Sequence, residues 1–536
     1  MAFALLLAFV YKTDAQSKVF KEVSEEISST TEPITQDGAL VGYLVFTQLE
    51  KASEDSFNYK ITIMDENLND IGTVDFKEIG LNLQAVSFEQ DVLCLAYLKS
   101  SIMGKTFSGK KAGLKEYQNA ADNNKAYIFT QFISLDGKII KQNNTPAAVT
   151  VKEEGGGYTT GAFGSWKTQN RYGSVQLSKS IELKNIAQQG FACFYGDNNG
   201  RKLIVFNSKG DQQWEKKTDG DCFSLLATTD YVYLLAAKNT TYYSSNFIFS
   251  RGVYSLYGYG VKDSSSYPVY HLEDKEGNGL NIFSFNTDPI TLKPYLAGYI
   301  IDPKKGKKFF TAMQRSRGSY AGLFTVNINS PKKSDIKETY SYWNDGGLNP
   351  DITKKGYFSE YKSYANFASS IRDFNGNTYF IGSQYHLRPK WGSIGFSALL
   401  VESVIAPALI IGIGGTSKFK ITDALVVKQD AKGVLTAQSS VPCDHTSFQM
   451  AKMPIEMKDN KSFYSVTNSD TKTNYLIVDD TKNTVIYNVS QNKVVKTIPH
   501  KEGKVTTNIA PAKEGHIMII EYNKKEKYTR LSIEAL

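Results

Sequence analysis

The residues of this chain that can do chemistry are mostly aromatic side chains, gathered in two stretches rich in Gly, Asn and Lys. The first, residues 155–166, reads GGGYTTGAFGSW and is long enough for a functional loop. The second covers residues 340–364. Rings exposed on one rim, with Asn and Asp nearby, can stack on a sugar or anchor a peptide. The aromatic residues of these stretches include Tyr158, Phe163, Trp166, Tyr340, Tyr342, Trp343, Tyr357, Tyr361 and Tyr364.

A third group surrounds His386 in residues 384–391, QYHLRPKW, where aromatic, basic and imidazole groups follow an expected strand. Loops at strand ends often bind ligands, although local packing is the alternative for this loop. The five histidines show no metal-ligand spacing, so we expect no metal site. The predicted ligand-binding residues are Tyr158, Trp166, Tyr342, Trp343, Tyr385, His386, Arg388 and Trp391.

Three segments resemble catalytic or cofactor-binding motifs, but each lacks a residue or a spacing that the motif requires. Residues 104–111 resemble a phosphate loop, but Lys111 stands where magnesium binding needs Ser or Thr. Residues 65–76 begin like a calcium loop, yet Asp70 replaces the required Gly and Phe76 the final Glu. Residues 392–395, GSIG, lack the spacing of a serine hydrolase turn. We therefore expect no cofactor and no catalytic residue, and the sequence leans away from an enzyme.

The elements that must position these residues are short strands. Residues 126–142, AYIFTQFISLDGKIIKQ, predict strand, turn and strand around Asp136-Gly137, a pair that accepts the positive φ angles of a tight hairpin. Apolar residues run together in the first strand, which predicts a sheet covered on both faces.

This unit recurs along the chain, and no amphipathic helix is evident between the copies. Eight windows of about four strands each follow one another at roughly 50–75-residue spacing, which favours a β-propeller over a sandwich. The first and last windows look incomplete. A propeller commonly closes by completing one blade from both termini, so we predict an all-β propeller of seven blades, within a range of six to eight, with loop insertions. In such a fold the aromatic rings have an alternative role, packing between blades or plugging the centre.

In this architecture the chain resembles exported bacterial β-propeller proteins with degenerate blades and no fixed blade motif. The resemblance covers residues 40–536. A WD pair, a kelch glycine series and an Asp-box are absent from the sequence. The resemblance therefore implies a fold and no substrate.

Composition limits the partners. The net charge of +8, from 62 basic and 54 acidic residues, is spread over expected turns, so we expect no nucleic-acid binding. Cys94 and Cys193 lie in apolar runs suited to buried thiols, and no CxxC pair exists. A bridge between Cys193 and Cys222 is left open.

The N-terminus predicts export. Residues 2–10, AFALLLAFV, are apolar, and small residues precede a cleavage point after Ala15, although a basic leader segment is missing. A frayed strand is the alternative. Residues 398–415 are apolar but interrupted by Glu402 and Pro407, which disfavours a membrane-spanning helix. The expected organisation is a signal peptide (1–15), an extended arm (16–39) and one propeller domain (40–536), secreted or periplasmic and monomeric.

Two functions remain open from sequence. The first is a non-enzymatic binding or scaffold protein for a protein or glycan at the cell envelope. The second is a propeller-type glycan hydrolase or lyase in the central funnel, which would need two convergent carboxylates among aromatic residues.

Overall fold

The computed structural model describes residues 17–21, 28–36, 39–53, 56–107, 111–154, 157–161, 164–168, 171–218, 221–244, 247–274, 280–301, 320–343, 352–353, 356–389, 417–449 and 461–536. These residues form a β-propeller, as the sequence predicts, with eight antiparallel sheets as its blades.

The first four blades follow one another in the sequence, and each runs from an inner to an outer strand. Blade 1 contains β2 (Ser28–Gln36), β3 (Ala39–Lys51), β4 (Phe57–Asp65) and β5 (Asp70–Glu78). Blade 2 contains β6 (Leu81–Glu89), β7 (Val92–Ser100), β9 (Ala126–Ser134) and β10 (Ile139–Pro146). Blade 3 contains β15 (Lys179–Ile186), β16 (Gly190–Asp197), β17 (Gly200–Asn207) and β18 (Gln212–Thr218). Blade 4 contains β19 (Asp221–Ala227), β20 (Tyr231–Ser244), β21 (Phe247–Gly260) and β22 (Tyr270–His271).

The last four blades follow the same plan with additions at their edges. Blade 5 contains β23 (Leu280–Thr287), β24 (Pro294–Ile301), β25 (Tyr320–Ile328) and β26 (Ile336–Tyr342), the last preceded by a 3-10 turn, Lys333–Asp335. Blade 6 contains β28 (Ser363–Arg372), β29 (Thr378–Pro389), β30 (Ser417–Gln429) and β31 (Leu435–Val441), with β27 (Tyr357–Phe358) and β32 (Thr446–Gln449) added. Blade 7 contains β33 (Ser462–Asn468), β34 (Thr473–Asp479), β35 (Asn483–Asn488) and β36 (Lys493–Pro499). Blade 8 contains β37 (Lys501–Glu502), β38 (Val505–Pro511), β39 (His516–Asn523), β40 (Tyr528–Ala535) and, from the N-terminus, β1 (Ser17–Lys21).

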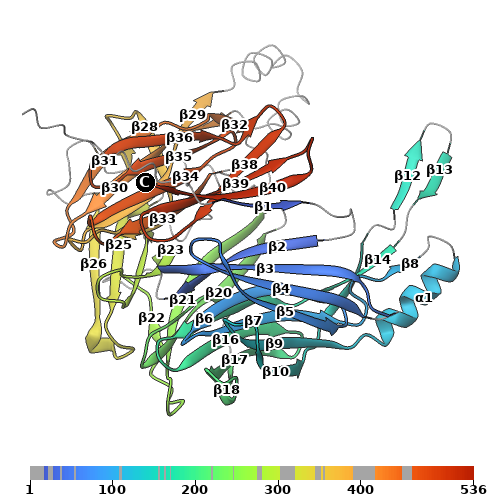
Figure 1. Ribbon diagram of the computed structural model, residues 1–536. Helices are drawn as coiled ribbons and strands as arrows, with labels where there is room; N and C mark the ends of the chain where they lie inside the picture. The colour runs from blue at the N-terminus through green and yellow to red at the C-terminus, as the bar shows by residue number, and fades with distance from the viewer. Residues whose placement is uncertain are drawn as a thin grey trace, which may run out of the picture.

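The two termini meet in blade 8. There β1 pairs antiparallel with β40, from Ser17 opposite Ser532 to Lys21 opposite Tyr528, and Figure 1 shows the blue strand beside the red one. Blade 1 nevertheless has four strands of its own. The count is therefore eight, within the predicted range, and the favoured count of seven is corrected because the first and last windows are separate blades. The expected arm, residues 16–39, supplies β1 and β2 to two sheets.

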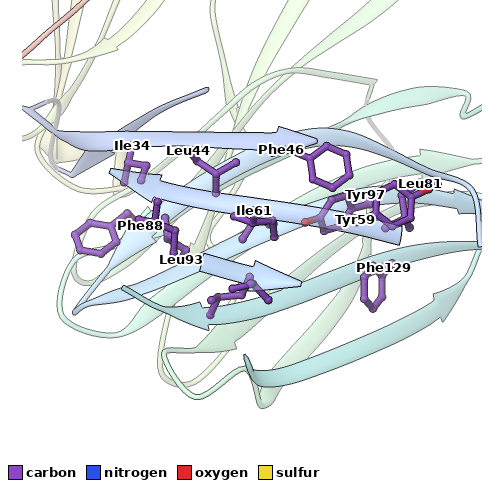
Figure 2. Packing of buried hydrophobic residues seen from close by; sticks show 14 of the residues in the cluster. Ile34, Leu44, Phe46, Tyr59, Ile61, Leu81, Phe88, Leu93, Tyr97 and Phe129 are labelled. Atoms are coloured by element: carbon purple, nitrogen blue, oxygen red, sulfur yellow. Dashed lines mark hydrogen bonds between the residues drawn. The ribbon is translucent and has the colours of Figure 1, made fainter. Parts of the chain in front are cut away.

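Continuous apolar runs mark the middle strands because both faces of each blade are covered. Every residue of β7 and of β16 is buried, whereas exposed and half-buried positions alternate along much of the outer strand β10. Figure 2 shows the layer between blades 1 and 2, where Leu44 and Ile61 face Leu93 and Phe129. The predicted hairpin is confirmed as β9 and β10, and Gly137 at its turn has a φ of +87°.

The connection between β7 and β9 of blade 2 and the connection from blade 2 to blade 3 together form an insertion that differs from the loops that the sequence predicted. It contains helix α1 (Lys111–Asp122), β8 (Thr106–Phe107), β11 (Thr150–Glu154), the hairpin of β12 (Gly157–Gly161) and β13 (Gly164–Thr168), and β14 (Arg171–Gln176). Figure 1 shows it projecting from the body of the propeller. Its small core is formed by Ile102, Phe107 and Tyr117. The apolar spacing of Leu114, Tyr117 and Ala121 was a helical signal hidden in a Lys/Asn-rich stretch.

The described cysteines are buried or half-buried thiols. Cys94 and Cys193 lie in one hydrophobic layer between blades 2 and 3, and both are free. A bridge from Cys193 to Cys222 is therefore absent from this structure. Burial raises the pKa of Cys193 to about 12, so its thiol is protonated and unreactive at neutral pH.

Candidate functional site

In the part of the chain that the structure describes, the strand ends joined by long connections meet at one face of the propeller. Because every blade runs up and down in the same sense, the link from its second to its third strand and the link to the next blade leave from the same face. These links include residues 101–125, 147–178, 302–319, 343–356, 390–416 and 450–461. The turns on the opposite face are short, the longest covering residues 261–269. We call the first face the loop-bearing face.

Five tyrosines form a cluster near this face at the junction of blades 5 and 6. Tyr299 and Tyr320 stack with ring centroids 3.9 Å apart, and Tyr364 stacks on Tyr385 at 5.7 Å. Tyr357 meets Tyr364 edge-on at 5.1 Å. The tyrosine cluster consists of Tyr299, Tyr320, Tyr357, Tyr364 and Tyr385.

Strand ends position these rings. Tyr320 opens β25, and Tyr299 lies near the end of the neighbouring β24. Tyr364 and Tyr385 are directly opposite each other in β28 and β29, which places both side chains on one side of blade 6. Tyr320 of blade 5 lies close enough to Tyr385 to raise its pKa. The ends of neighbouring antiparallel strands meet at one face, so rings distant in sequence come together.

Hydrogen bonds fix the cluster to the backbone of both blades. The Tyr299 hydroxyl accepts from the backbone N–H of Phe367 and donates to the carbonyl of Ala365 at 3.4 Å. The amide of Asn281 donates to the Tyr320 hydroxyl at 3.1 Å and accepts from Tyr254 at 3.4 Å. Such bonds hold the rings in a single arrangement.

The cluster has a buried layer and an accessible layer. Tyr299 and Tyr385 are buried, whereas Tyr320, Tyr357 and Tyr364 are half-buried. Burial is the main cause that raises the pKa of Tyr385 well above its usual value, and the nearby Tyr320 and Tyr364 add to it. Its hydroxyl therefore stays protonated at neutral pH and serves as a hydrogen-bonding group.

The predicted site residues fall into three locations. Trp343 is buried in the layer between blades 5 and 6, the packing role that the sequence left open, and Tyr385 is buried beneath the stacked ring of Tyr364. Tyr342 is half-buried and stacks on Tyr340 at 6.1 Å, on the side of blade 5 that faces blade 4. Tyr158 and Trp166 lie on β12 and β13, and Arg388 lies near the end of β29, but their side chains are outside the described residues. Trp391 is also outside them.

His386 points to the other side of blade 6. Its Nδ1 lies 2.9 Å from the carbonyl oxygen of Lys362, and its Nε2 lies 3.4 Å from the Thr422 hydroxyl. The ring is therefore fixed between β28 and β30 and is separated from the tyrosine cluster by the sheet, because neighbouring residues of a strand face opposite sides.

A hydrogen-bonded chain crosses blade 6 on that second side. Ser363 donates to Gln384 at 3.0 Å, Gln384 to Ser440 at 2.6 Å, and Ser440 to Asp423 at 3.2 Å. His445 Nε2 lies 3.2 Å from the other oxygen of Asp423. Because Ser440 bonds the carboxylate and not the imidazole, these groups do not form the serine–histidine pair that activates a nucleophile.

Two carboxylates lie on inner strands near the propeller axis. Glu32 on β2 and Glu182 on β15 are half-buried, and burial is the first cause that raises the pKa of each above the usual value for Glu. Lys184 opposes the shift at Glu182. These blades are separated by blade 2, whose inner strand is β6.

The described residues were also considered for a metal site and for a membrane-spanning helix. Within the ranges given above, no group of three or more His, Cys, Asp or Glu side chains is placed to hold a metal ion. Among the same residues, no helix is long and apolar enough to cross a membrane. The apolar segment 398–415 lies outside them.

Sequence reasoning found three of the five residues of the tyrosine cluster. It named Tyr357, Tyr364 and Tyr385 but missed Tyr299 and Tyr320, which stand in apolar strand runs. Their position at the strand ends beside long connections was a usable signal. The closeness of the five rings follows from blade packing, which a single sequence does not display.

The chain is similar to one protein family in sequence and to several solved structures in fold. Residues 1–103 match the model of a family described as a family of unknown function (DUF6770). The chain is similar to the Dos1 propeller, at 7% identity and a TM-score of 0.42 over 97% of this chain and 95% of that one. It is also similar to BamB from Moraxella catarrhalis, at 8% identity and a TM-score of 0.34 over 94% and 99%. The WD40 domain of SCAP from fission yeast matches at 8% identity and a TM-score of 0.35 over 94% and 98%. The fold assignment itself rests on the sheet topology.

Proposed function

We propose that this chain is an exported, non-enzymatic binding or scaffold protein that holds a glycan or protein segment on its loop-bearing face. The observation that carries the proposal is the tyrosine cluster at the strand ends of blades 5 and 6. Its partner would be a molecule of the cell envelope.

The chemistry of the cluster supports a glycan in first place. Half-buried tyrosine rings offer flat faces for sugar C–H groups, and their hydroxyls and the Asn281 amide lie beside them. The inner rings are already ordered, so little conformational entropy is lost on binding. A protein segment anchored by aromatic contacts would use the same features.

A glycan array with the chain from residue 16 onward tests this proposal. We expect binding to a defined set of glycans that is lost in Tyr320→Ala and Tyr364→Ala. Tyr528→Ala is the matched control, because Tyr528 is half-buried and opens β40 of blade 8 as Tyr320 opens β25 of blade 5. Trp166→Ala tests the β12–β13 hairpin separately. If no glycan on the array is bound, the proposal of a glycan ligand is rejected. A peptide array would then test the proposal of a protein ligand.

Export is proposed from the apolar leader alone. The first strand, β1, begins at Ser17, directly after the expected cleavage at Ala15, so cleavage leaves the closing strand intact. Mass spectrometry of the protein recovered from its host tests this. A mature N-terminus at Gln16 supports export, and an uncleaved leader contradicts it.

A second candidate, a glycan hydrolase or lyase, draws on Glu182, a half-buried carboxyl on the inner strand β15 whose pKa is raised by burial. A carboxyl whose pKa is raised by burial suits a general acid. Incubation of array-positive glycans with the protein, followed by mass analysis, distinguishes the two functions. Cleavage that is lost in Glu182→Gln supports an enzyme, whereas intact glycans support binding alone.

A further inference from the structure

Lys461 and Asp480 form a buried pair at the loop-bearing end of blade 7. In the register of β33 and β34, Ser462 is opposite Asp479, so Lys461 and Asp480 occupy the next opposing positions. Residues directly opposite on antiparallel strands have adjacent side chains. Lys461 Nζ lies 3.9 Å from Asp480 Oδ1, and each side chain is 1% exposed.

The backbone of Asp444 contacts both members of the pair. The backbone carbonyl of Asp444 accepts from Lys461 Nζ at 3.3 Å, and its backbone N–H donates to Asp480 Oδ2. The Asp444 carboxylate oxygen Oδ2 is buried and has no hydrogen-bond partner among the described residues. The Asp444 backbone thus bridges Lys461 and Asp480, whose side chains are shielded from water, and the half-buried Asp444 carries its carboxylate next to this bridge in the chain.

The Lys461–Asp480 separation exceeds that of a direct charge-assisted hydrogen bond, which is about 2.7–2.9 Å. At this separation the two charges form no direct hydrogen bond with each other, and their burial away from water carries a desolvation cost. Conversion of the pair to a neutral amide would remove both charges from the interior. The two strands already hold the reacting groups side by side, which favours a reaction that would be slow between free side chains.

We propose that Lys461 and Asp480 are joined by an isopeptide bond. The Lys461 ammonium first gives a proton to the Asp444 carboxylate, and the neutral Nζ attacks the side-chain carbonyl carbon of Asp480. The tetrahedral adduct keeps one N–H and loses one carboxyl oxygen as water, which takes two protons originally on Nζ. Asp444 accepts and returns the proton, so no oxidant or co-reactant is needed. The product ties the first two strands of blade 7 together.

The intact mass of the full-length or leader-cleaved chain tests this bond, independently of any ligand. We expect a mass one water below that of the sequence, and a branched peptide that links Lys461 to Asp480 after digestion. Lys461→Arg should restore the full mass. Lys496→Arg, which alters a more exposed lysine beside Glu534, should keep the deficit.

Two further variants separate the chemistry from folding. Asp480→Asn offers an amide, so the same attack would release ammonia and the mass deficit would change accordingly. Asp444→Ala retains both reacting groups but removes the proton acceptor, and we expect the deficit to disappear or to develop more slowly. A full, unmodified mass for the folded wild-type protein would overturn the proposal even if the variants fail to fold.

Discussion

Arg372 of blade 6 crosses to blade 5, where its Nη1 donates to Asp288 Oδ2 at 2.8 Å and its Nη2 donates to Asn327. Its guanidinium also lies 4.2 Å from the ring centroid of Tyr295. The two charged side chains are 10% and 7% exposed. This contact joins the blades that carry the tyrosine cluster, at the opposite end of the sheets.

Replacing Arg372 by Met should destabilise the protein strongly, because Asp288 would keep a buried charge without its partner. We expect a loss of about 3–5 kcal/mol in the free energy of unfolding, measured with urea. Arg530→Met, in an exposed pair with Glu521 at 3.9 Å, should cost at most about 1 kcal/mol. Equal losses in the two variants would contradict the role of the buried pair.

The same carboxylate predicts a pH dependence. Burial alone would raise the pKa of Asp288, but hydrogen bonds from Arg372 and from the backbone N–H groups of Thr291 and Ile290 lower it below 3.8. A lowered pKa in the folded state stabilises the protein above the unfolded value, and this stabilisation is lost as the pH falls through the folded value. Asp288→Asn should therefore be less stable than wild type at pH 7, and the difference should shrink between about pH 4 and pH 2. A constant difference across that range would argue against this titration.

Glu182 should show the opposite behaviour. Burial raises its pKa above 4.5 in the folded state, so the ionised form is penalised there and folding is weakened as the pH rises through the folded value. Glu182→Gln should raise the melting temperature at pH 8 and change it little at pH 4. Glu526→Gln, in an exposed turn, is the control. A Glu182→Gln variant less stable than wild type at pH 8 would refute this account.

A buried amide also connects blades 5 and 6. Gln429 accepts from Thr325 at 2.9 Å and donates to Ser341 at 2.6 Å. Gln429→Leu leaves two buried hydroxyls without this partner and should cost about 2–4 kcal/mol in urea unfolding. Gln142→Leu, on the exposed edge strand β10, should cost less than about 0.5 kcal/mol. An unchanged free energy of unfolding in Gln429→Leu would show that water replaces the amide.

Closure by β1 predicts an effect on association. Val19 in this strand is 52% exposed, so the strand is held mainly by backbone pairing to β40. Removing residues 1–21 frees the edge of β40, and free edges pair with other chains. We expect concentration-dependent oligomers by size-exclusion chromatography, while the intact chain stays at constant size. A truncated chain that elutes as a monomer at every concentration would contradict this.

The sequence predicted the blade architecture because strands that are covered on both faces consist of continuous apolar runs, as in β7 and β16. It missed α1 because the Lys and Asn residues around the helix resembled a loop. It offered Trp343 as a binding residue from its Gly/Asn-rich surroundings, but that ring is 5% exposed and packs on Phe358. Local composition indicates how a segment folds. The closeness of Tyr320 to Tyr385 depends instead on how blades 5 and 6 pack against each other.

The affinity of the tyrosine cluster for a ligand tests the central claim most directly. Titration calorimetry with the strongest array-positive glycan should give a dissociation constant at least about tenfold weaker for Tyr364→Ala than for wild type, a loss of about 1.4 kcal/mol in binding free energy. The control variant Tyr528→Ala should bind the glycan with the affinity of wild type. The melting temperatures of Tyr528→Ala and Tyr364→Ala are measured as well, so that a loss of affinity can be separated from a loss of stability. Unchanged affinity in Tyr364→Ala and Tyr320→Ala, with both variants folded, would contradict the claim that this cluster is the binding site.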